Sequence, residues 1–138
     1  MRRVIVTGAR TWTDMKTVYN TLTDEWLDHG DFVLVHGACP SGADKFAHEW
    51  ALWAQVYPNF NVSIETFPAD WSLGKKAGPI RNQMMVDAGA NRMFAFPMED
   101  SVGTLGCIEM AKKAGIQVIV IKENPKNKNW MAEGKKSK

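Results

Sequence analysis

Arg81 and Asn82 are the residues best placed to bind an anion. They stand in the first turn of a predicted helix that follows Ala77-Gly78-Pro79. A cation in that turn is opposed by the positive end of the helix dipole, so a ligand anion or a buried acid is expected to offset it. A guanidinium can bind phosphate through two parallel hydrogen bonds. Arg81 is therefore the first candidate for an anion-binding side chain.

Two glycine-bearing loops follow the first two predicted strands. The first begins Gly8-Ala9-Arg10, and the second runs from His36 to Asp44 through Gly37 and Gly42. Neither loop carries the G-x-G-x-x-G pattern of dinucleotide-binding proteins or the lysine of a P-loop. Glycine lets the backbone approach a ligand closely, so both loops are predicted to contact a phosphate. The alternatives are a surface arginine on a plain turn at Arg10 and a satisfied structural group at His36.

A third phosphate contact is predicted where Ser101, Gly103 and Thr104 open the last helix. Hydroxyls and unpaired N–H groups at a helix start suit an anion, although the same residues also suit a simple N-cap. Glu99 and Asp100 stand beside this turn. They would repel a phosphate at close range, but they could accept hydrogen bonds from ribose hydroxyls or act as a base.

Aromatic side chains in two loops could stack on a base. Trp71 follows Asp70 and precedes Lys75-Lys76 in a loop predicted over residues 68–78, and Trp12 lies in the first loop. A tryptophan offers a large flat surface, and the lysines could steer an anion. The alternative is a solvated loop held by one anchoring tryptophan.

These considerations give two sets of candidates. The ligand-binding set is Gly8, Ala9, Arg10, Trp12, His36, Gly37, Ser41, Gly42, Trp71, Gly78, Arg81, Asn82, Ser101, Gly103 and Thr104. The catalytic set is Arg81, Asp44, Asp70 and Glu99. Asp44 also suits a plain role in the first turn of a helix, and Cys39 has no evident partner that would make it a nucleophile. No metal site is predicted.

Hydrophobic patterning supplies the elements that must position these loops. It predicts strands at 3–7, 32–35, 62–67, 93–96 and 117–121, and helices at 14–29, 43–56, 79–89 and 104–114. Alternating strands and helices indicate an α/β fold: one Rossmann-like, three-layer domain with a five-stranded, mainly parallel sheet. Because ligands bind outside the carboxyl ends of parallel strands, the four candidate loops are expected to meet at the carboxyl end of the sheet.

Composition limits the other classes of protein. Residues 1–121 are predicted to form the domain, and residues 122–138, with six Lys and two Glu, a basic flexible tail. The rest of the chain is mildly acidic, which argues against a duplex-DNA binder. Two separated cysteines and the lack of a long apolar run or leader pattern favour a reduced, cytoplasmic protein without a membrane partner.

The motifs together resemble the YspA-type branch of the SLOG superfamily. The resemblance rests on Gly8-Ala9-Arg10, His36-Gly37, Gly42-Ala43-Asp44-Lys45, Phe67-Pro68-Ala69-Asp70-Trp71, Gly74 to Met85, Ala95-Phe96-Pro97 and Gly103-Thr104. It implies a Rossmann-like fold that binds nucleotides or ADP-ribose-like compounds. The same superfamily includes the DNA-processing protein DprA and the Lonely Guy phosphoribohydrolases, which cut an N-glycosidic bond with an arginine that Arg81 resembles. Their acids after Gly-Thr are replaced here by Gly106 and Cys107.

Three functions follow from the residues and the resemblance. The first is a sensor or sequestering protein for a nucleotide or nucleotide-derived small molecule, with no cofactor required. The second is a hydrolase of the N-glycosidic bond of a nucleoside 5′-monophosphate. The third is a single-stranded nucleic-acid module, which the Lys75-Lys76 pair and the tail alone would favour. The sequence leaves open whether the protein turns over its ligand. A homodimer is compatible with its Trp and Met content.

Overall fold

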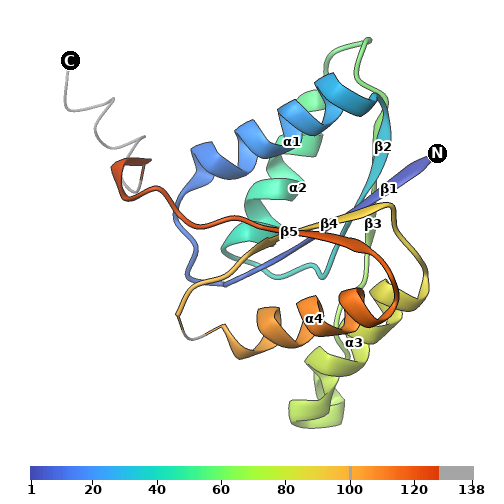
Figure 1. The fold of residues 1–138 in the computed structure, drawn as a ribbon, viewed down its shortest axis with the longest axis vertical. Helices are drawn as coiled ribbons and strands as arrows, with labels where there is room; N and C mark the ends of the chain where they lie inside the picture. Colours follow the sequence, from blue (N-terminus) through green and yellow to red (C-terminus); the bar gives the residue numbers. More distant parts are fainter. Residues whose placement is uncertain (100, 128–138) are drawn as a thin grey trace.

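The computed structural model describes residues 1–99 and 101–127, and these form one α/β domain (Figure 1). Strands and helices alternate along the chain. In order they are β1 (Arg2–Gly8), α1 (Met15–His29), β2 (Phe32–His36), α2 (Ala43–Ala54), β3 (Val62–Thr66), the 3₁₀ segment η1 (Trp71–Lys76), α3 (Ala77–Asp87), β4 (Arg92–Phe96), α4 (Val102–Lys113), β5 (Gln117–Val120) and the 3₁₀ turn η2 (Pro125–Asn127).

The five strands form one sheet in the order β3-β2-β1-β4-β5, and every neighbouring pair is parallel. The prediction of a Rossmann-like, three-layer domain is confirmed. The chain moves outward from β1 to β3 on one side and then returns to place β4 on the other side of β1. Loops leaving β1 and β4 therefore diverge, which opens a crevice between them at the carboxyl end of the sheet.

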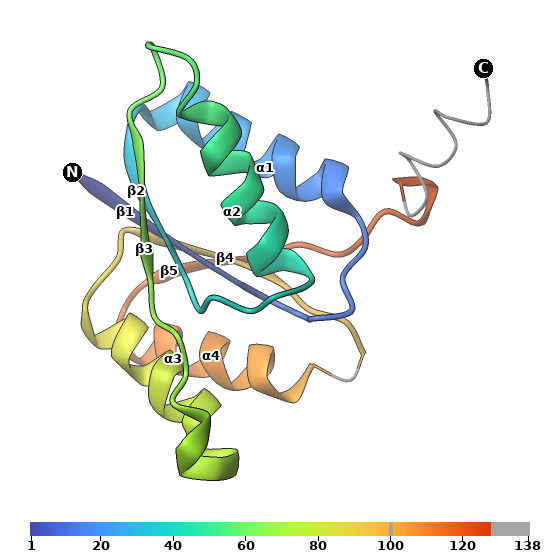
Figure 2. The same cartoon turned by 180° about the vertical axis from the view of Figure 1, so that it is seen from behind.

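Helices α1 and α2 cover one face of the sheet (Figures 1 and 2). The side chains that alternate inward on this face include Val4, Val6 and Leu34, and they pack against Leu22 of α1 and Trp50 of α2. All five are fully buried. At about 25 cal/mol per Å² of apolar surface removed from water, this layer is a main source of stability.

Helices α3 and α4 cover the other face with a smaller core. Ile5 and Val35 of the sheet pack with Met85 of α3 and with Cys107 and Ala111 of α4. Because successive side chains of a strand point to opposite faces, Val4 and Ile5 enter different cores. The sheet is thus buried on both sides, which explains its nearly continuous apolar strands.

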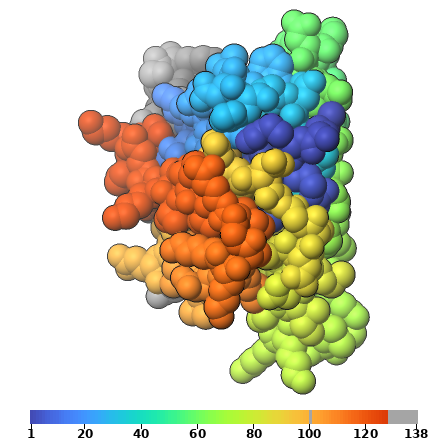
Figure 3. All heavy atoms as spheres, turned by 45° about the vertical axis from the view of Figure 1, so that its right-hand side comes forward, coloured from blue at the N-terminus to red at the C-terminus, as the bar shows by residue number. Residues whose placement is uncertain are grey.

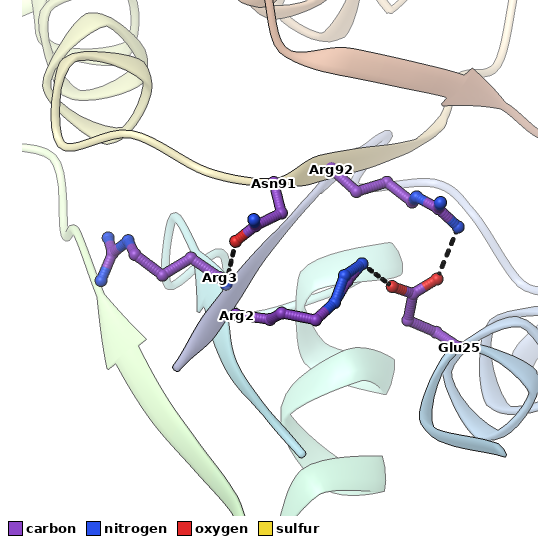
Figure 4. Close-up of polar contacts among 5 residues, drawn as sticks. All are labelled: Arg2, Arg3, Glu25, Asn91 and Arg92. Carbon is purple, nitrogen blue, oxygen red and sulfur yellow. Dashed lines mark hydrogen bonds and ion pairs between the residues drawn. The ribbon is translucent and has the colours of Figure 1, made fainter. Parts of the chain in front are cut away.

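The amino end of the sheet is closed by a cluster of charged and amide side chains, called here the amino-end cluster: Arg2, Arg3, Glu25, Asn91 and Arg92 (Figure 4). Glu25, whose side chain is 1% exposed, accepts hydrogen bonds from Arg2 at 2.6 Å and Arg92 at 2.8 Å. Asn91 accepts a hydrogen bond from the backbone N–H of Arg3 at 2.8 Å. These contacts tie α1 to β1 and β4.

The predicted start of the third helix needs correction. The helix predicted from Pro79 begins at Ala77, because η1 runs into it directly after a kink at Gly74, whose φ is +74°. The predicted loop over 68–78 is therefore largely helical. Pro79 is tolerated because the first N–H groups of a helix have no intrahelical acceptor.

The tail predicted to begin at Lys122 also needs correction. Asn124 donates its backbone N–H to Asp14 at 2.8 Å, and η2 packs on α1, so residues up to Asn127 belong to the fold. The remainder of the predicted tail, residues 128–138, lies outside the described residues, as does the candidate Asp100.

Candidate functional site

A cleft of about 1300 Å³ opens at the carboxyl end of the sheet. Its walls come from the loops after β1, β2 and β4, from η1 and α3, and from the segment after β5. Thirteen of the sequence-predicted site residues line it: Gly8, Ala9, Arg10, Gly37, Asp44, Trp71, Gly78, Arg81, Asn82, Glu99, Ser101, Gly103 and Thr104. The expectation that the candidate loops lie together at the carboxyl end of the sheet is therefore confirmed.

Arg81 forms part of the cleft wall and is 8% exposed. It donates hydrogen bonds to Asn82 Oδ1 at 2.7 Å and to the backbone carbonyls of Gly37 and Phe67. These acceptors are neutral, and no carboxylate in the described residues lies within 4 Å of its guanidinium. The charge of Arg81 is therefore oriented by the backbone but left without an ion-pair partner.

Gly37 is required by the position of Arg81. A Cβ atom on Gly37 would lie 2.6 Å from Nη1 and 2.8 Å from Cζ of the guanidinium. The loop after β2 consequently lets the arginine reach across beneath the cleft. The next residue, Ala38, has a φ of +59°, which is a strained conformation for a residue with a side chain.

Asp44 holds this loop in place from the first turn of α2. Its Oδ2 accepts the backbone N–H groups of Gly37 at 3.1 Å and Cys39 at 3.3 Å. Burial raises the pKa of Asp44 above its ordinary value, although the hydrogen bonds to Cys39 and Gly37 and the charge of Arg81 act in the opposite direction. Burial and the neighbouring Asp44 carboxylate also raise the pKa of the Cys39 thiol. The Asp44 carboxylate therefore supports the loop after β2.

His36 lies beneath the cleft rather than in its wall. It is 3% exposed, and its Nδ1 accepts the backbone N–H of Ala38 at 3.0 Å. A proton on Nε2 can then be donated to Nδ1 of His48, 2.9 Å away. Burial, then His48 and Arg81, lower the pKa of His36 to about 4. The imidazole is thus a neutral link between β2 and α2.

The start of α4 faces the cleft with unpaired donors. The first intrahelical bond of the turn is the one from Leu105 N–H to the Ser101 carbonyl, so the N–H groups of residues 102–104 precede the hydrogen-bonded ladder. Ser101 accepts the N–H of Met98 at 2.7 Å with its hydroxyl oxygen, which leaves the hydroxyl proton for another acceptor. This arrangement suits an anion.

Arg10 and Trp71 meet at the mouth of the cleft. The guanidinium carbon of Arg10 lies 5.2 Å from the centre of the Trp71 ring, a cation–π contact between exposed residues. The contact brings the loop after β1 next to η1. Asp70 accepts hydrogen bonds from Ser72 and so begins η1, but it does not line the cleft.

Three other predicted site residues have structural positions. Trp12 is 1% exposed, packs edge-on against Phe96 and donates to the Asp14 carbonyl, so it does not face a ligand. Ser41 donates to the Arg10 carbonyl from outside the cleft. Gly42 has a φ of +76° and passes directly against the backbone of Ala9 and Arg10. Both residues fasten the second loop to the first.

The sequence reasoning missed Lys122 and Glu123, which also line the cleft. They were assigned to a tail because the composition there is polar and aperiodic. The usable signal was their position directly after a strand, which is the rule that selected the other loops. Among the described residues, no cluster of His, Cys, Asp or Glu could hold a metal ion, and no helix there is long and apolar enough to cross a membrane.

The strand order, the crevice beside β1 and the lack of a P-loop define a Rossmann-like domain outside the standard dehydrogenase and P-loop classes. A family model described as "YspA, cpYpsA-related SLOG family" matches residues 2–74. The chain is also 48% identical over 128 residues to the Gene 61 protein of Mycobacterium phage D29, covering 91% of this chain and all of that protein. The chain belongs to the YspA, cpYpsA-related SLOG family.

Two solved structures share the fold. The molybdenum cofactor binding protein from Rippkaea orientalis superimposes with a TM-score of 0.61 at 19% identity, covering 98% of this chain and 85% of that one. The Moco carrier protein from Chlamydomonas reinhardtii gives a TM-score of 0.57 at 19% identity, covering 96% and 83%. At this identity the likeness establishes the architecture, in agreement with the sheet order.

Proposed function

We propose that this protein binds a nucleotide or nucleotide-derived small molecule in the cleft and acts as its sensor or sequestering protein. The observation that carries the proposal is the distribution of charge on the cleft wall. Arg10 and Arg81 have no ion-pair partner in the described residues, and the start of α4 supplies free N–H groups in the same cleft. A phosphate would satisfy all three.

The topology supports one position for the proposed phosphate. The crevice between the loops after β1 and β4 brings Gly8 and Ala9 next to Ser101 and Gly103. A Cβ on Gly103 would meet no atom within 4 Å, so there is open space beside the helix start. An anion in this space would gain from the helix dipole and from backbone donors.

Trp71 would hold the ring of the ligand. It is 56% exposed, although tryptophan is normally well buried, and its only ring partner among the described residues is Arg10. A base, or a ring of the molybdenum cofactor named for the two structural neighbours, could take the place of Arg10 or stack on the opposite face.

The test is a thermal-shift and calorimetric screen of AMP, ADP, ADP-ribose, NAD, cyclic nucleotides and the molybdenum cofactor. A ligand at about 100 times its Kd should add about 2.7 kcal/mol to stability, which gives a clear shift in Tm. Arg10→Ala should weaken binding of the active compound by about tenfold without lowering the Tm of the free protein, because Arg10 is exposed. Trp71→Ala should weaken it as well.

Lys112→Ala is the matched control, since this exposed cation lies on α4 outside the cleft. It should leave binding unchanged. Equal effects of Arg10→Ala and Lys112→Ala would show only nonspecific attraction of anions. No shift with any compound in the panel would refute the proposed function.

Glycosidic hydrolysis is the second candidate, and the position of Glu99 favours it. Glu99 is exposed on the cleft wall beside the start of α4, close to where a phosphate would bind. Asp44 is a poorer base because it already accepts two backbone N–H groups. Release of free base from a nucleoside 5′-monophosphate, lost in Glu99→Gln, would establish turnover. Nucleotide binding without release of free base would refute hydrolysis and leave the sensor or sequestering function.

A further inference from the structure

The segment after β5 forms one wall of the cleft. Val120, Lys122 and Glu123 line it, and β5 stands at the opposite edge of the sheet from β3, the strand that precedes η1. Figure 3 shows this segment, in deep orange, beside the blue residues of α1 and next to the paler orange start of α4. None of the functions considered above uses it.

Two backbone hydrogen bonds fix Glu123 in place. Before it, Ile121 donates its N–H to the Ala95 carbonyl at 2.8 Å, which continues the pairing of β5 with β4. After it, Asn124 donates its N–H to Oδ2 of Asp14, the fully buried N-cap residue of α1. Glu123 therefore lies on a short stretch held at both ends, and its backbone position is set before any ligand arrives.

The carboxylate of Glu123 is incompletely satisfied. Its Oε2 is buried but has no hydrogen-bond partner among residues 1–99 and 101–127. A buried acceptor without a partner is costly, and a carboxylate oxygen especially so. Because Oε2 itself is shielded from solvent, a donor on a bound molecule could reach it only after the side chain turns towards the cleft that it lines.

We propose that Glu123 accepts hydrogen bonds from hydroxyl or amino donors on a second part of the ligand, beyond the phosphate and away from Trp71. This inference rests on the proposed function. The ligand class is then a phosphate-linked compound with groups on both sides of its phosphate: a ring at Trp71 and a sugar or another donor-bearing unit at Glu123.

The dimensions of the sheet support a two-ended ligand. Five strands in the order β3-β2-β1-β4-β5 place the proposed phosphate site near the middle, with η1 after β3 at one edge and Glu123 after β5 at the other. With strands about 4.8 Å apart, a phosphate between β1 and β4 lies roughly 12 Å from β3 and roughly 7 Å from β5, which leaves more room for a ring at Trp71 than for the unit at Glu123. The cleft, at about 1300 Å³, also exceeds the usual range of about 300–1,000 Å³ for small-molecule pockets.

The test compares AMP and ADP, which end at their first and second phosphates, with ADP-ribose, which continues from the second phosphate into a second sugar. The wild-type protein should bind ADP-ribose more tightly. Glu123→Ala should weaken ADP-ribose by about tenfold to a hundredfold and leave AMP and ADP unchanged, since a hydrogen bond to a charged group is lost only with the longest ligand. Arg10→Ala should weaken all three.

Glu109→Gln and Glu123→Gln form a matched pair, because Glu109 is exposed on α4 outside the main cleft. Only Glu123→Gln should reduce the preference for ADP-ribose. The free Glu123→Gln protein should melt no lower than the wild type, because its buried oxygen loses no partner. A lower Tm with unchanged ligand preference would mean a structural role and would overturn the inference.

The two proposals fail in different ways. If all three ligands bind and Arg10→Ala weakens them while Glu123→Ala changes none, the Glu123 subsite is refuted and the phosphate site stands. Equal weakening of AMP, ADP and ADP-ribose by Glu123→Ala also refutes the subsite. If the wild type binds none of these compounds and no other member of the panel, the proposed function fails, and the Glu123 inference fails with it.

Discussion

The two ends of the sheet carry similar charged side chains but use them in opposite ways. In the amino-end cluster, Glu25 receives two arginines at 2.6 and 2.8 Å (Figure 4). At the carboxyl end, Arg81 is held by neutral carbonyls and an amide. The first arrangement places a buried carboxylate between two arginines, whereas the second holds an arginine in position without an ion-pair partner in the described residues.

The difference indicates which arginines are functional candidates. Arginine appears at both ends, so residue type alone does not separate a support from a site. The separating feature is the partner: a buried carboxylate makes an arginine structural, while backbone acceptors make it available to an outside anion. Glu123 has a buried oxygen without a donor in the described part of the chain, as Arg2, Arg3 and Arg92 have buried nitrogens without an acceptor, but only Glu123 of these four lines the cleft.

The largest effect is expected from Glu25→Gln. It would leave Arg2 and Arg92 facing an amide, and removal of one partner of a buried ion cluster costs about 3 kcal/mol or more. The free energy of unfolding should fall by that amount in urea titrations at pH 7. Ligand affinity, measured where the variant is still folded, should stay within about twofold, because the cluster lies at the opposite end of the sheet from the cleft.

The control for this variant is Glu65→Gln. Glu65, which lies level with Ile5 in the middle of the sheet, pairs with Arg3 of the amino-end cluster, but its side chain is 40% exposed. An exposed pair contributes about 0–1 kcal/mol. Equal losses in the two variants would mean that burial does not set the strength of the amino-end contacts. A large loss of ligand affinity in Glu25→Gln would mean that the two ends are coupled.

A smaller effect is expected at two glycines with the same backbone conformation. Gly42 and Gly30 have φ values of +76° and +80°, and they stand at the cleft end and the amino end of the sheet respectively. Alanine at Gly30 would meet no atom within 4 Å and should cost about 1 kcal/mol or more, because a φ of +80° with a ψ of −160° is adopted almost exclusively by glycine. Alanine at Gly42 would collide with the Ala9 carbonyl oxygen and should cost a further 1–3 kcal/mol, roughly.

The glycine pair also tests whether ligand binding depends on the contact between the loop after β2 and the Gly8-Ala9-Arg10 turn. Gly42→Ala should weaken ligand binding as well as stability, because it separates the loop after β2 from the Gly8-Ala9-Arg10 turn. Denaturant melts give the two losses of stability, and calorimetry gives the affinities. Equal costs at Gly30 and Gly42 would show that the two loops can move apart freely.

Sequence reasoning was most accurate where one physical rule dominates. Alternating apolar strands and amphipathic helices require a two-sided parallel sheet, and Gly30 and Gly115 end helices with φ values of +80° and +79°. Most candidate residues line the cleft because the carboxyl ends of parallel strands share one edge. These conclusions needed periodicity and connectivity but no tertiary contact.

The errors came from contacts between distant residues. Trp12 lies in a loop as predicted, but its ring is not available to stack on a base. It packs against Phe96 and donates to the Asp14 carbonyl, which places it in the core. Residues 122–127 have no periodicity, and only the bond from Asn124 to Asp14, 110 positions earlier, fixes them. Local composition contains no record of such pairs, so neither the burial of Trp12 nor the position of Glu123 could be derived from it.

The last prediction concerns pH, and His36 at the cleft end is the group that carries it. Its pKa of about 4 in the native protein lies below the ordinary 6.5. Between these values the unfolded chain binds a proton that native His36 does not, so the free energy of unfolding falls as the pH is lowered from about 6.5. The slope is at most about 1.4 kcal/mol per pH unit for one proton.

His36→Gln should remove this slope while keeping a donor for His48. Urea melts of both proteins at pH 7 and pH 5 give the comparison, and the wild type should lose about 1–2 kcal/mol more than the variant over this interval. Asp44, whose pKa burial raises, acts with the opposite sign, because the native state then keeps a proton that the unfolded chain releases. Asp44 is present in both proteins, so its contribution cancels in the difference.

Equal pH dependence in the two proteins would mean that His36 is protonated in the native state. The assignment of His36 as a neutral imidazole between β2 and α2 would then be wrong. A protonated Nδ1 also could not accept the hydrogen bond from the Ala38 N–H.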